Sequence, residues 1–214
     1  MKKTRTAIAA GLLLAPAPAF AHPHIFAEAR LEVIAGSDGN ISELRNIWRF
    51  DEMFSASVML DFDKNSDLKL DKDELAEVGK VVHESLADFD YYTFVTEDGK
   101  KTDLAKPDAV HVDYDNGQIL MFFSIKPAKP MPMKGKMSFG VWDPTMYTAI
   151  DFANDTDLAT KGDGFNACKR AVIRPDADEV LAQNQSTLTD AFFNDPTGTD
   201  MSKLFSTRLE VTCP

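Results

Sequence analysis

The sequence predicts an α+β protein, built mainly as an antiparallel β-sandwich with one inserted helix-loop-helix. Two observations support this fold class. Short stretches rich in β-branched and aromatic residues recur between turn sequences, which is typical of antiparallel sheets. Between residues 51 and 89 the apolar residues instead recur every three or four positions, which is typical of amphipathic helices.

Strands are expected on both sides of this insertion. Residues 25–34 and 41–50 flank a Ser-Asp-Gly-Asn turn and form a first hairpin. Residues 110–114 and 119–125 form the clearest hairpin, since Asn116-Gly117 between them suits a type I′ turn. Further strands are expected at 91–97, 136–142, 148–152 and 169–174, with a short helix at 178–185 and a helix end followed by a last strand within 204–211.

The first residues are typical of a signal peptide. A basic head (Lys2, Lys3 and Arg5) precedes a short apolar run at residues 7–14, and Ala-Phe-Ala at 19–21 places small residues at the cleavage position. The apolar run is shorter than the ~20 residues that a membrane-spanning helix needs.

We therefore expect residues 1–21 to be removed as a signal peptide and the mature chain to begin at His22. Residues 22–214 are expected to form a single β-rich domain in the periplasm, with the helical insertion at 51–89. No later stretch is apolar for long enough to cross a membrane, so the protein is not expected to be membrane-spanning.

The charge of the chain excludes one class of partner. It carries 34 Asp and Glu against 23 Lys and Arg, a formal net charge of −11. Cleavage of the signal peptide would remove Lys2, Lys3 and Arg5 and make the mature chain more acidic. An acidic surface repels phosphate backbones, so we expect no nucleic-acid partner.

The two cysteines, Cys168 and Cys213, are expected to form a disulfide bond. A lone pair of cysteines in an oxidising compartment is most simply joined in this way, and the bond would stabilise the fold by ~4 kcal/mol because it closes a long loop. A thiolate metal site or a redox pair is the alternative.

The loop between the two expected helices follows the ligand order of an EF-hand. A short helix fits Met53 to Leu60, and a longer one fits Leu75 to Phe89. Ca²⁺ prefers six to eight oxygen ligands, which one short loop supplies at alternating positions. With Asp63 as position one, the predicted ligands are Asp63, Asn65, Asp67, the Lys69 carbonyl, Asp71 and the bidentate Glu74. The predicted insertion is therefore an EF-hand-like helix-loop-helix.

One position departs from that pattern, because Leu68 stands at loop position six, where a glycine normally makes the sharp turn. Holding leucine at positive φ costs roughly 1–2 kcal/mol, which weakens Ca²⁺ binding by about tenfold. The alternative is an acidic turn that keeps the EF-hand shape without the metal.

Two histidines lie at the expected start of the mature chain, in His22-Pro23-His24. The free α-amine and two imidazoles offer up to three nitrogen donors, which suit Zn²⁺, Ni²⁺ or Cu²⁺. Pro23 has no N–H, so the amine-plus-amide chelate is blocked and other ligands must complete a site. The candidates are His83, His111, Asp51, Glu52 and Asp143. The alternative is that the chain start is frayed and the other two histidines are ordinary surface residues.

Four short motifs together resemble a known family. They are His22-Pro23-His24-Ile25-Phe26, Trp48-Arg49-Phe50-Asp51-Glu52, Phe89-Asp90-Tyr91-Tyr92 and Trp142-Asp143-Pro144-Thr145-Met146-Tyr147, with the acidic loop between the second and third. The chain is similar in these to a family of unknown function described as the periplasmic component of an uncharacterised ABC-type transport system. The resemblance extends to about Arg174; the chain departs from it at Leu68 and in an extra segment after about Asp176.

Members of that family are often encoded beside permeases of the nickel/cobalt type, and some are linked to zinc acquisition. The resemblance therefore implies a periplasmic transition-metal-binding accessory that serves an inner-membrane metal permease, with Zn²⁺ (or Ni²⁺/Co²⁺) as the metal. His22 and His24 are the expected metal ligands, with Asp143 and Asp51 as their carboxylate partners.

Two other functions compete with this interpretation. A calcium-stabilised, non-catalytic interaction module would explain the acidic loop and leave the terminal histidines incidental. A copper enzyme that uses the amino terminus and His22 needs a third histidine at the site. We expect no enzyme, since the sequence contains no Ser-His-Asp or Cys-His arrangement and no phosphate-binding loop.

Overall fold

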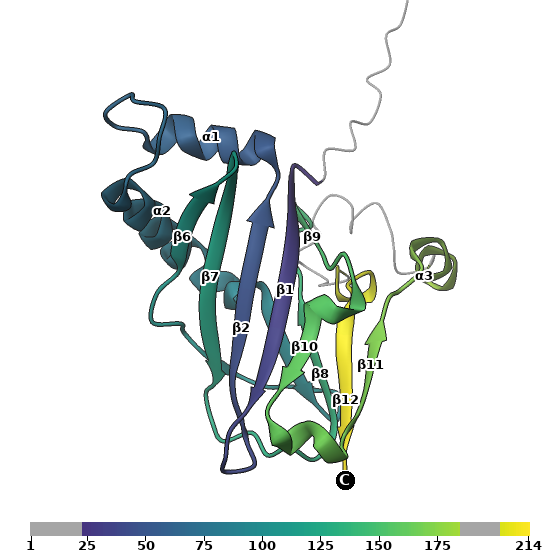
Figure 1. Ribbon diagram of the computed structural model, residues 1–214. Helices are drawn as coiled ribbons and strands as arrows, with labels where there is room; N and C mark the ends of the chain where they lie inside the picture. The colour runs from purple at the N-terminus through teal and green to yellow at the C-terminus, as the bar shows by residue number, and fades with distance from the viewer. Residues whose placement is uncertain (1–22, 185–201) are drawn as a thin grey trace, which may run out of the picture.

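The computed structural model describes residues 23–184 and 202–214. The predicted signal peptide, His22 and the last residue of the helix predicted at 178–185 lie outside this part of the chain. The described residues form two facing β-sheets, with two helices packed against the first sheet and a third helix on the side of the second (Figure 1). This confirms the predicted α+β fold, a mainly antiparallel sandwich with an inserted helix-loop-helix.

The elements have the following bounds. The strands are β1 Ile25–Ala35, β2 Ile41–Phe50, β3 Thr93–Glu97, β4 Lys100–Lys101, β5 Leu104–Ala105, β6 His111–Asp115, β7 Gln118–Pro127, β8 Gly135–Val141, β9 Thr148–Asp151, β10 Leu158–Lys161, β11 Lys169–Ile173 and β12 Arg208–Cys213. The α-helices are α1 Glu52–Phe62, α2 Lys72–Ser85 and α3 Ala177–Gln183, and the 3₁₀ helices are η1 Leu86–Tyr92, η2 Asp155–Asp157, η3 Asp163–Ala167 and η5 Ser202–Leu204.

The first sheet has the order β10-β1-β2-β7-β5, with β6 also paired to β7 and β9 also paired to β1. Its β1–β2 and β6–β7 pairs are the two predicted hairpins, β2–β7 is a further antiparallel pair, and β9 and β10 run parallel to β1. The second sheet, β11-β12-β8-β3-β4, is antiparallel throughout.

The core lies between the two sheets and follows from the alternation along each strand. Along β1, Leu31 and Val33 are fully buried while their neighbours face outward. Trp48 from β2 meets Phe123 edge-to-face at 5.0 Å, and Phe139 of β8 is fully buried from the opposite sheet. The predicted type I′ turn is confirmed, because Asn116 and Gly117 both have positive φ, 50° and 84°.

The two helices of the insertion pack at the edge of the first sheet. Asp51 caps α1, and a capping box of Asp71 and Glu74 starts α2. Gly79 lets α2 approach β6, because a Cβ there would lie 2.3 Å from the Val110 carbonyl oxygen.

The second helix is shorter than the predicted 75–89 pattern. It ends at Ser85, and the chain continues as η1, in which Asp90, Tyr91 and Tyr92 take positive φ. This turn buries the Tyr91 ring, so tertiary packing overrides the helical period at Phe89.

The end of the sandwich opposite α1 is closed covalently. Cys168, just before β11, is bonded to Cys213 at the end of β12, which confirms the predicted disulfide (Figure 1). Among the described helices, none has the length and apolar character needed to cross a bilayer.

Candidate functional site

The first described residues are fixed from two sides at the α1 end of the sandwich. The His24 N–H donates to the Tyr147 carbonyl oxygen at 2.9 Å, and the two rings lie 4.9 Å apart. The Phe26 N–H donates to Asp51 Oδ2 at 2.8 Å, and the Asp51 N–H donates back to the Phe26 carbonyl at 2.9 Å. The start of β1 is therefore held between the α1 cap and the turn that follows β8.

Asp143 holds that turn together. Its side chain is only 3% exposed. Oδ1 accepts from the Thr145 N–H at 2.7 Å and the Thr145 hydroxyl at 2.6 Å, while Oδ2 accepts from the Thr148 N–H at 2.9 Å. These bonds fix the start of β9, whose first residue pairs with Ile25.

A tyrosine lies against this carboxylate. Burial of the Tyr92 phenol, followed by the negative charge of Asp143 and their hydrogen bond, raises the pKa of Tyr92. Tyr92 therefore stays neutral and acts as a hydrogen-bond donor at physiological pH. Sequence reasoning did not single out Tyr92 or Tyr147 individually, although both occur in the motifs quoted above.

Asp51 has two structural roles at once. Its Oδ1 accepts from the Phe54 N–H at 2.9 Å as the α1 N-cap, while Oδ2 accepts from Phe26. Partial burial raises the pKa of Asp51, but the backbone N–H groups of Phe54 and Phe26 outweigh it, so that pKa lies below its ordinary value. Glu52, the neighbouring candidate, is exposed in the first turn of α1.

The structure brings three of the four predicted transition-metal ligands to the same end of the molecule; the fourth, His22, is outside the described residues. Asp51 accepts one of the hydrogen bonds described above on each oxygen and keeps a second lone pair there, whereas Oδ1 of Asp143 already accepts two hydrogen bonds and Tyr92 bonds the same carboxylate. Within residues 23–184 and 202–214, no three His, Cys, Asp or Glu side chains form a metal-sized cluster.

A hollow opens beside the chain start. It has a volume of about 310 Å³ and is bounded by Pro23, the Trp142-Asp143 turn, β9 and the segment around Phe205.

The predicted calcium loop has an EF-hand-like shape. Asp63 accepts the N–H groups of Asp67 and Leu68, at 3.1 and 2.8 Å, and Asn65 also accepts from Asp67 at 2.9 Å. Leu68 has the left-handed φ of 61° that the register requires, and its side chain is 73% exposed.

The two ends of this loop are joined by Glu74. One carboxylate oxygen accepts from the Lys64 N–H and the other from the Asp71 N–H, both at 2.9 Å. Asp67 accepts from the Lys69 N–H, so the predicted ligands are connected by side-chain-to-backbone bonds. The conformation of the loop is therefore supported by hydrogen bonds between its own atoms.

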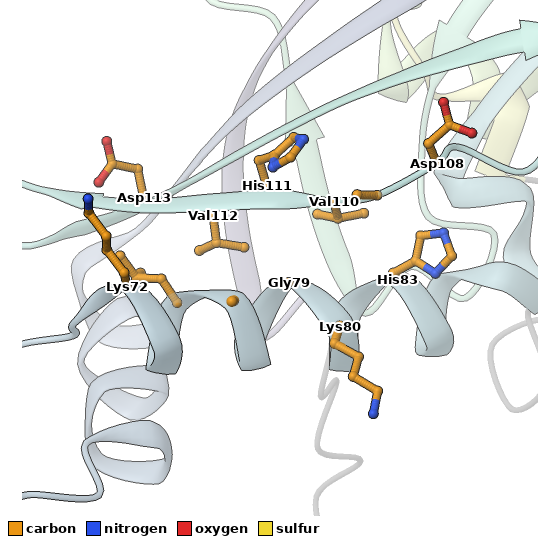
Figure 2. A pocket seen from close by; sticks show the side chains of 12 residues that line it. Lys72, Gly79, Lys80, His83, Asp108, Val110, His111, Val112 and Asp113 are labelled. Atoms are coloured by element: carbon orange, nitrogen blue, oxygen red, sulfur yellow. The ribbon is translucent and has the colours of Figure 1, made fainter.

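The two remaining histidines line a different cavity, between α2 and β6 (Figure 2). The groove has a volume of about 550 Å³. His83 Nε2 lies 2.8 Å from the Pro107 carbonyl oxygen, and the Tyr91 hydroxyl donates to the His83 carbonyl at 3.0 Å. His111 projects from β6 away from the helix, whereas Val112 points toward it (Figure 2). His83 thus fastens a loop, and neither histidine shares the hollow beside the chain start.

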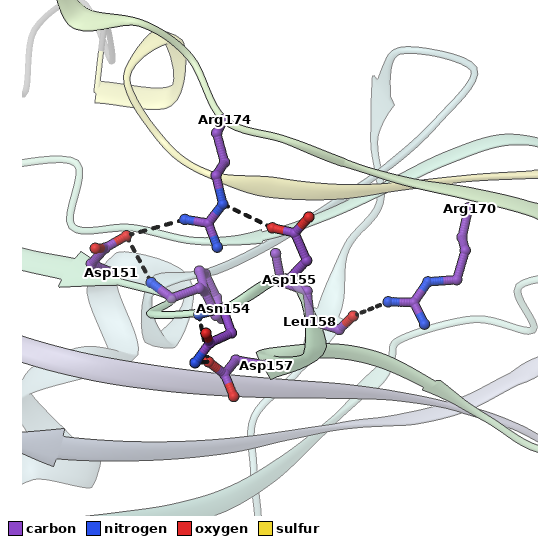
Figure 3. A network of polar contacts seen from close by, with 8 residues as sticks. Asp151, Asn154, Asp155, Asp157, Leu158, Arg170 and Arg174 are labelled. Carbon is purple, nitrogen blue, oxygen red and sulfur yellow. Dashed lines mark hydrogen bonds and ion pairs between the residues drawn. The ribbon is translucent and has the colours of Figure 1, made fainter.

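A polar network ties the β9–β10 segment to the second sheet (Figure 3). Arg174, just after β11, donates to Asp155 at 2.9 Å and lies 3.8 Å from Asp151. Arg170 donates to the Leu158 carbonyl at 2.7 Å. These contacts fix the two strands that run parallel to β1.

The comparisons with known proteins agree with the motif resemblance only at the level of the family. A family described as "Protein of unknown function (DUF1007)" matches residues 7–213. No curated protein matches the chain.

Proposed function

The chain belongs to the DUF1007 family of proteins of unknown function, and on that premise we propose that it is a periplasmic protein that binds a transition metal, Zn²⁺ or Ni²⁺/Co²⁺, and serves an inner-membrane metal permease. The signal-peptide pattern of residues 1–21 supports the location. The role is non-catalytic.

The observation that carries the proposal is the anchoring of the chain start. A terminal His-Pro-His segment would ordinarily be frayed and a poor site. Here the His24 backbone is hydrogen-bonded to Tyr147, and the backbone of Phe26 in the following strand is fixed by Asp51. Holding ligands in place before the metal arrives lowers the entropy that binding must overcome.

The donor set suits a borderline metal ion. His22 supplies an imidazole and, after cleavage, an α-amine, and His24 supplies a second imidazole. Asp51 is bonded to the backbone two residues after His24, and Asp143 holds the turn whose Tyr147 carbonyl binds His24; Asp51 also keeps a second lone pair on each oxygen. In this proposal they position the histidine segment and complete the ligand set.

The test is a calorimetric Zn²⁺ titration of the mature protein, with its native His22 amino terminus and Ca²⁺ in excess. We expect sub-micromolar, one-to-one binding that is lost in the double variant His22→Ala/His24→Ala. His111→Ala is the matched control, because this exposed histidine lies on β6, outside the hollow. Equal binding by wild type and double variant, or no binding by either, would refute the proposal.

A second function, a calcium-stabilised interaction module, is favoured by the conformation of the acidic loop. Leu68 takes the left-handed φ that glycine normally provides, and Glu74 already bridges the two ends of the loop. This function predicts a rise in melting temperature with Ca²⁺ but not with Zn²⁺, and loss of that rise in Glu74→Gln. An identical melting curve with Ca²⁺ and with a chelator would exclude it.

A further inference from the structure

Exposed apolar side chains are concentrated at the α1 end of the molecule. Seven large hydrophobic side chains are exposed among the described residues, and five of them lie on β1, on α1 or in the loops beside them: Phe26, Met53, Leu60, Leu68 and Tyr147. Isolated exposed hydrophobic residues are normal, but a local group marks an interaction surface.

Helix α1 is apolar on two faces. Its inner face buries Val58 and Met59 against the sheet. The outer face presents Met53, Ala56 and Leu60, at positions i, i+3 and i+7, which lie in one line along a helix. Met53 is 79% exposed and Leu60 is 76% exposed.

The outer line continues onto the start of β1. Phe26 is 56% exposed, and its backbone is joined to Asp51, two residues before Met53. Figure 1 shows α1 lying across the end of the first sheet, with its first turn beside β1 and no other described element on its far side. We call Phe26, Met53, Ala56 and Leu60 the α1 docking face.

The charges at both ends of this face limit what can cover it. Glu52 and Asp61 are exposed at the first and last turns, and α1 contains no basic residue. An anionic lipid surface would be repelled. A second copy of the chain would bring acid against acid whether its α1 packed parallel or antiparallel.

We propose that the α1 docking face binds a protein surface that is apolar at its centre and basic at its margin. The apolar line supplies the buried contact, and Glu52 and Asp61 select the partner by charge. The inference concerns a surface distinct from the metal ligands and holds with or without metal.

The test uses two synthetic helical peptides, each with a leucine face, one with lysines and one with glutamates on its polar face. Fluorescence anisotropy is recorded with chelator present. We expect one-to-one binding of the lysine peptide that weakens as salt is raised, and no binding of the glutamate peptide. Met53→Gln/Leu60→Gln should weaken binding roughly tenfold or more. Leu181→Gln, an exposed leucine on α3, is the matched control.

Three results would overturn the proposal. The first is equal peptide binding by wild type and Met53→Gln/Leu60→Gln, or no binding by either. The second is sedimentation with phosphatidylglycerol or phosphatidylcholine vesicles that the same variant abolishes, since the occupant would then be a membrane. The third is a wild-type dimer that the variant dissociates. The variant His22→Ala/His24→Ala should keep peptide binding, which separates this proposal from the metal-binding one.

Discussion

The two ends of the sandwich are held together in different ways. At one end, a single covalent bond joins the start of β11 to the end of β12. At the other, the chain start, the α1 cap and the turn after β8 are joined by hydrogen bonds to Asp51, Asp143 and Tyr147 and by the contact of the His24 and Tyr147 rings. The disulfide forms only under oxidising conditions. The hydrogen bonds at the other end depend on ionised carboxylates, and single substitutions can remove them one at a time.

The exposed apolar side chains follow the same division. They accumulate at the hydrogen-bonded end and not around the disulfide. Both proposed binding surfaces, the chain start and the α1 docking face, therefore lie at the hydrogen-bonded end. The disulfide at the opposite end contributes to stability. The four predictions below test that division, in order of decreasing effect.

Removal of the disulfide should have the largest effect. The double variant Cys168→Ala/Cys213→Ala opens a loop whose ends are 45 residues apart, and we expect it to lower the free energy of unfolding by about 4 kcal/mol. Denaturant titration measures this loss, and reduced wild type should match the variant. Zn²⁺ or peptide binding by the folded variant should not change; loss of either would show that the two ends are not independent.

Asp143→Asn should destabilise the hydrogen-bonded end by roughly 2–3 kcal/mol, because a buried amide N–H₂ would face backbone donors that now meet a carboxylate. Denaturant titration again gives the value. Asp155→Asn is the control, since this carboxylate is exposed and its pair with Arg174 contributes at most about 1 kcal/mol. Equal effects would contradict the assigned role of Asp143.

Asp51→Asn should lower the free energy of unfolding by about 1 kcal/mol at neutral pH, because the one amide oxygen can keep the α1 cap but the N–H₂ group cannot accept from the Phe26 N–H. The folded-state pKa of Asp51 lies below its ordinary value of 3.8, so its stabilisation is present above about pH 4 and is lost as pH falls through that lower pKa. The difference between wild type and variant should shrink in acid. Glu52→Gln is the control, and a pH-independent difference would contradict the argument.

Leu68→Gly should have the smallest effect, a gain of roughly 0.5–1 kcal/mol in the absence of metal. Glycine removes the ~1–2 kcal/mol cost of holding leucine at left-handed φ. It also raises the conformational entropy of the unfolded chain, which offsets part of this gain in stability. Lys69→Gly, at a position outside the left-handed region, should instead destabilise. A loss of stability in Leu68→Gly would show that Leu68 makes contacts that its exposure does not reveal.

Most strands could be predicted from sequence because their signals are local. The alternation of β1, β2 and β7 and the Asn116-Gly117 turn appear at nearly the expected residues. Strand β10 was not predicted. Its parallel pairing with β1 joins residues that are far apart in the sequence, such as Leu31 and Leu158, so no local pattern indicates it.

The candidate site shows the same limit. Sequence reasoning grouped Asp51 and Asp143 with the terminal histidines as metal ligands, and the structure places Asp51, Asp143 and His24 at the same end of the sandwich. Their bonds to Phe26 and Thr148 were not predicted, because a hydrogen bond between distant residues follows from strand register and not from spacing. The role of both residues as metal ligands remains a proposal.

The position of β1 and β12 within the sheets has a consequence for the order of folding. Strand β1 lies between β2 and the later strands β9 and β10, and β12, near the other end of the sequence, lies between β11 and β8. Neither sheet is complete until residues far along the chain have arrived, which makes contacts non-local and folding slow. If the chain is exported in sequence order, as the proposed function requires, it would complete its first sheet only after residue 161 has emerged and its second sheet only after residue 213.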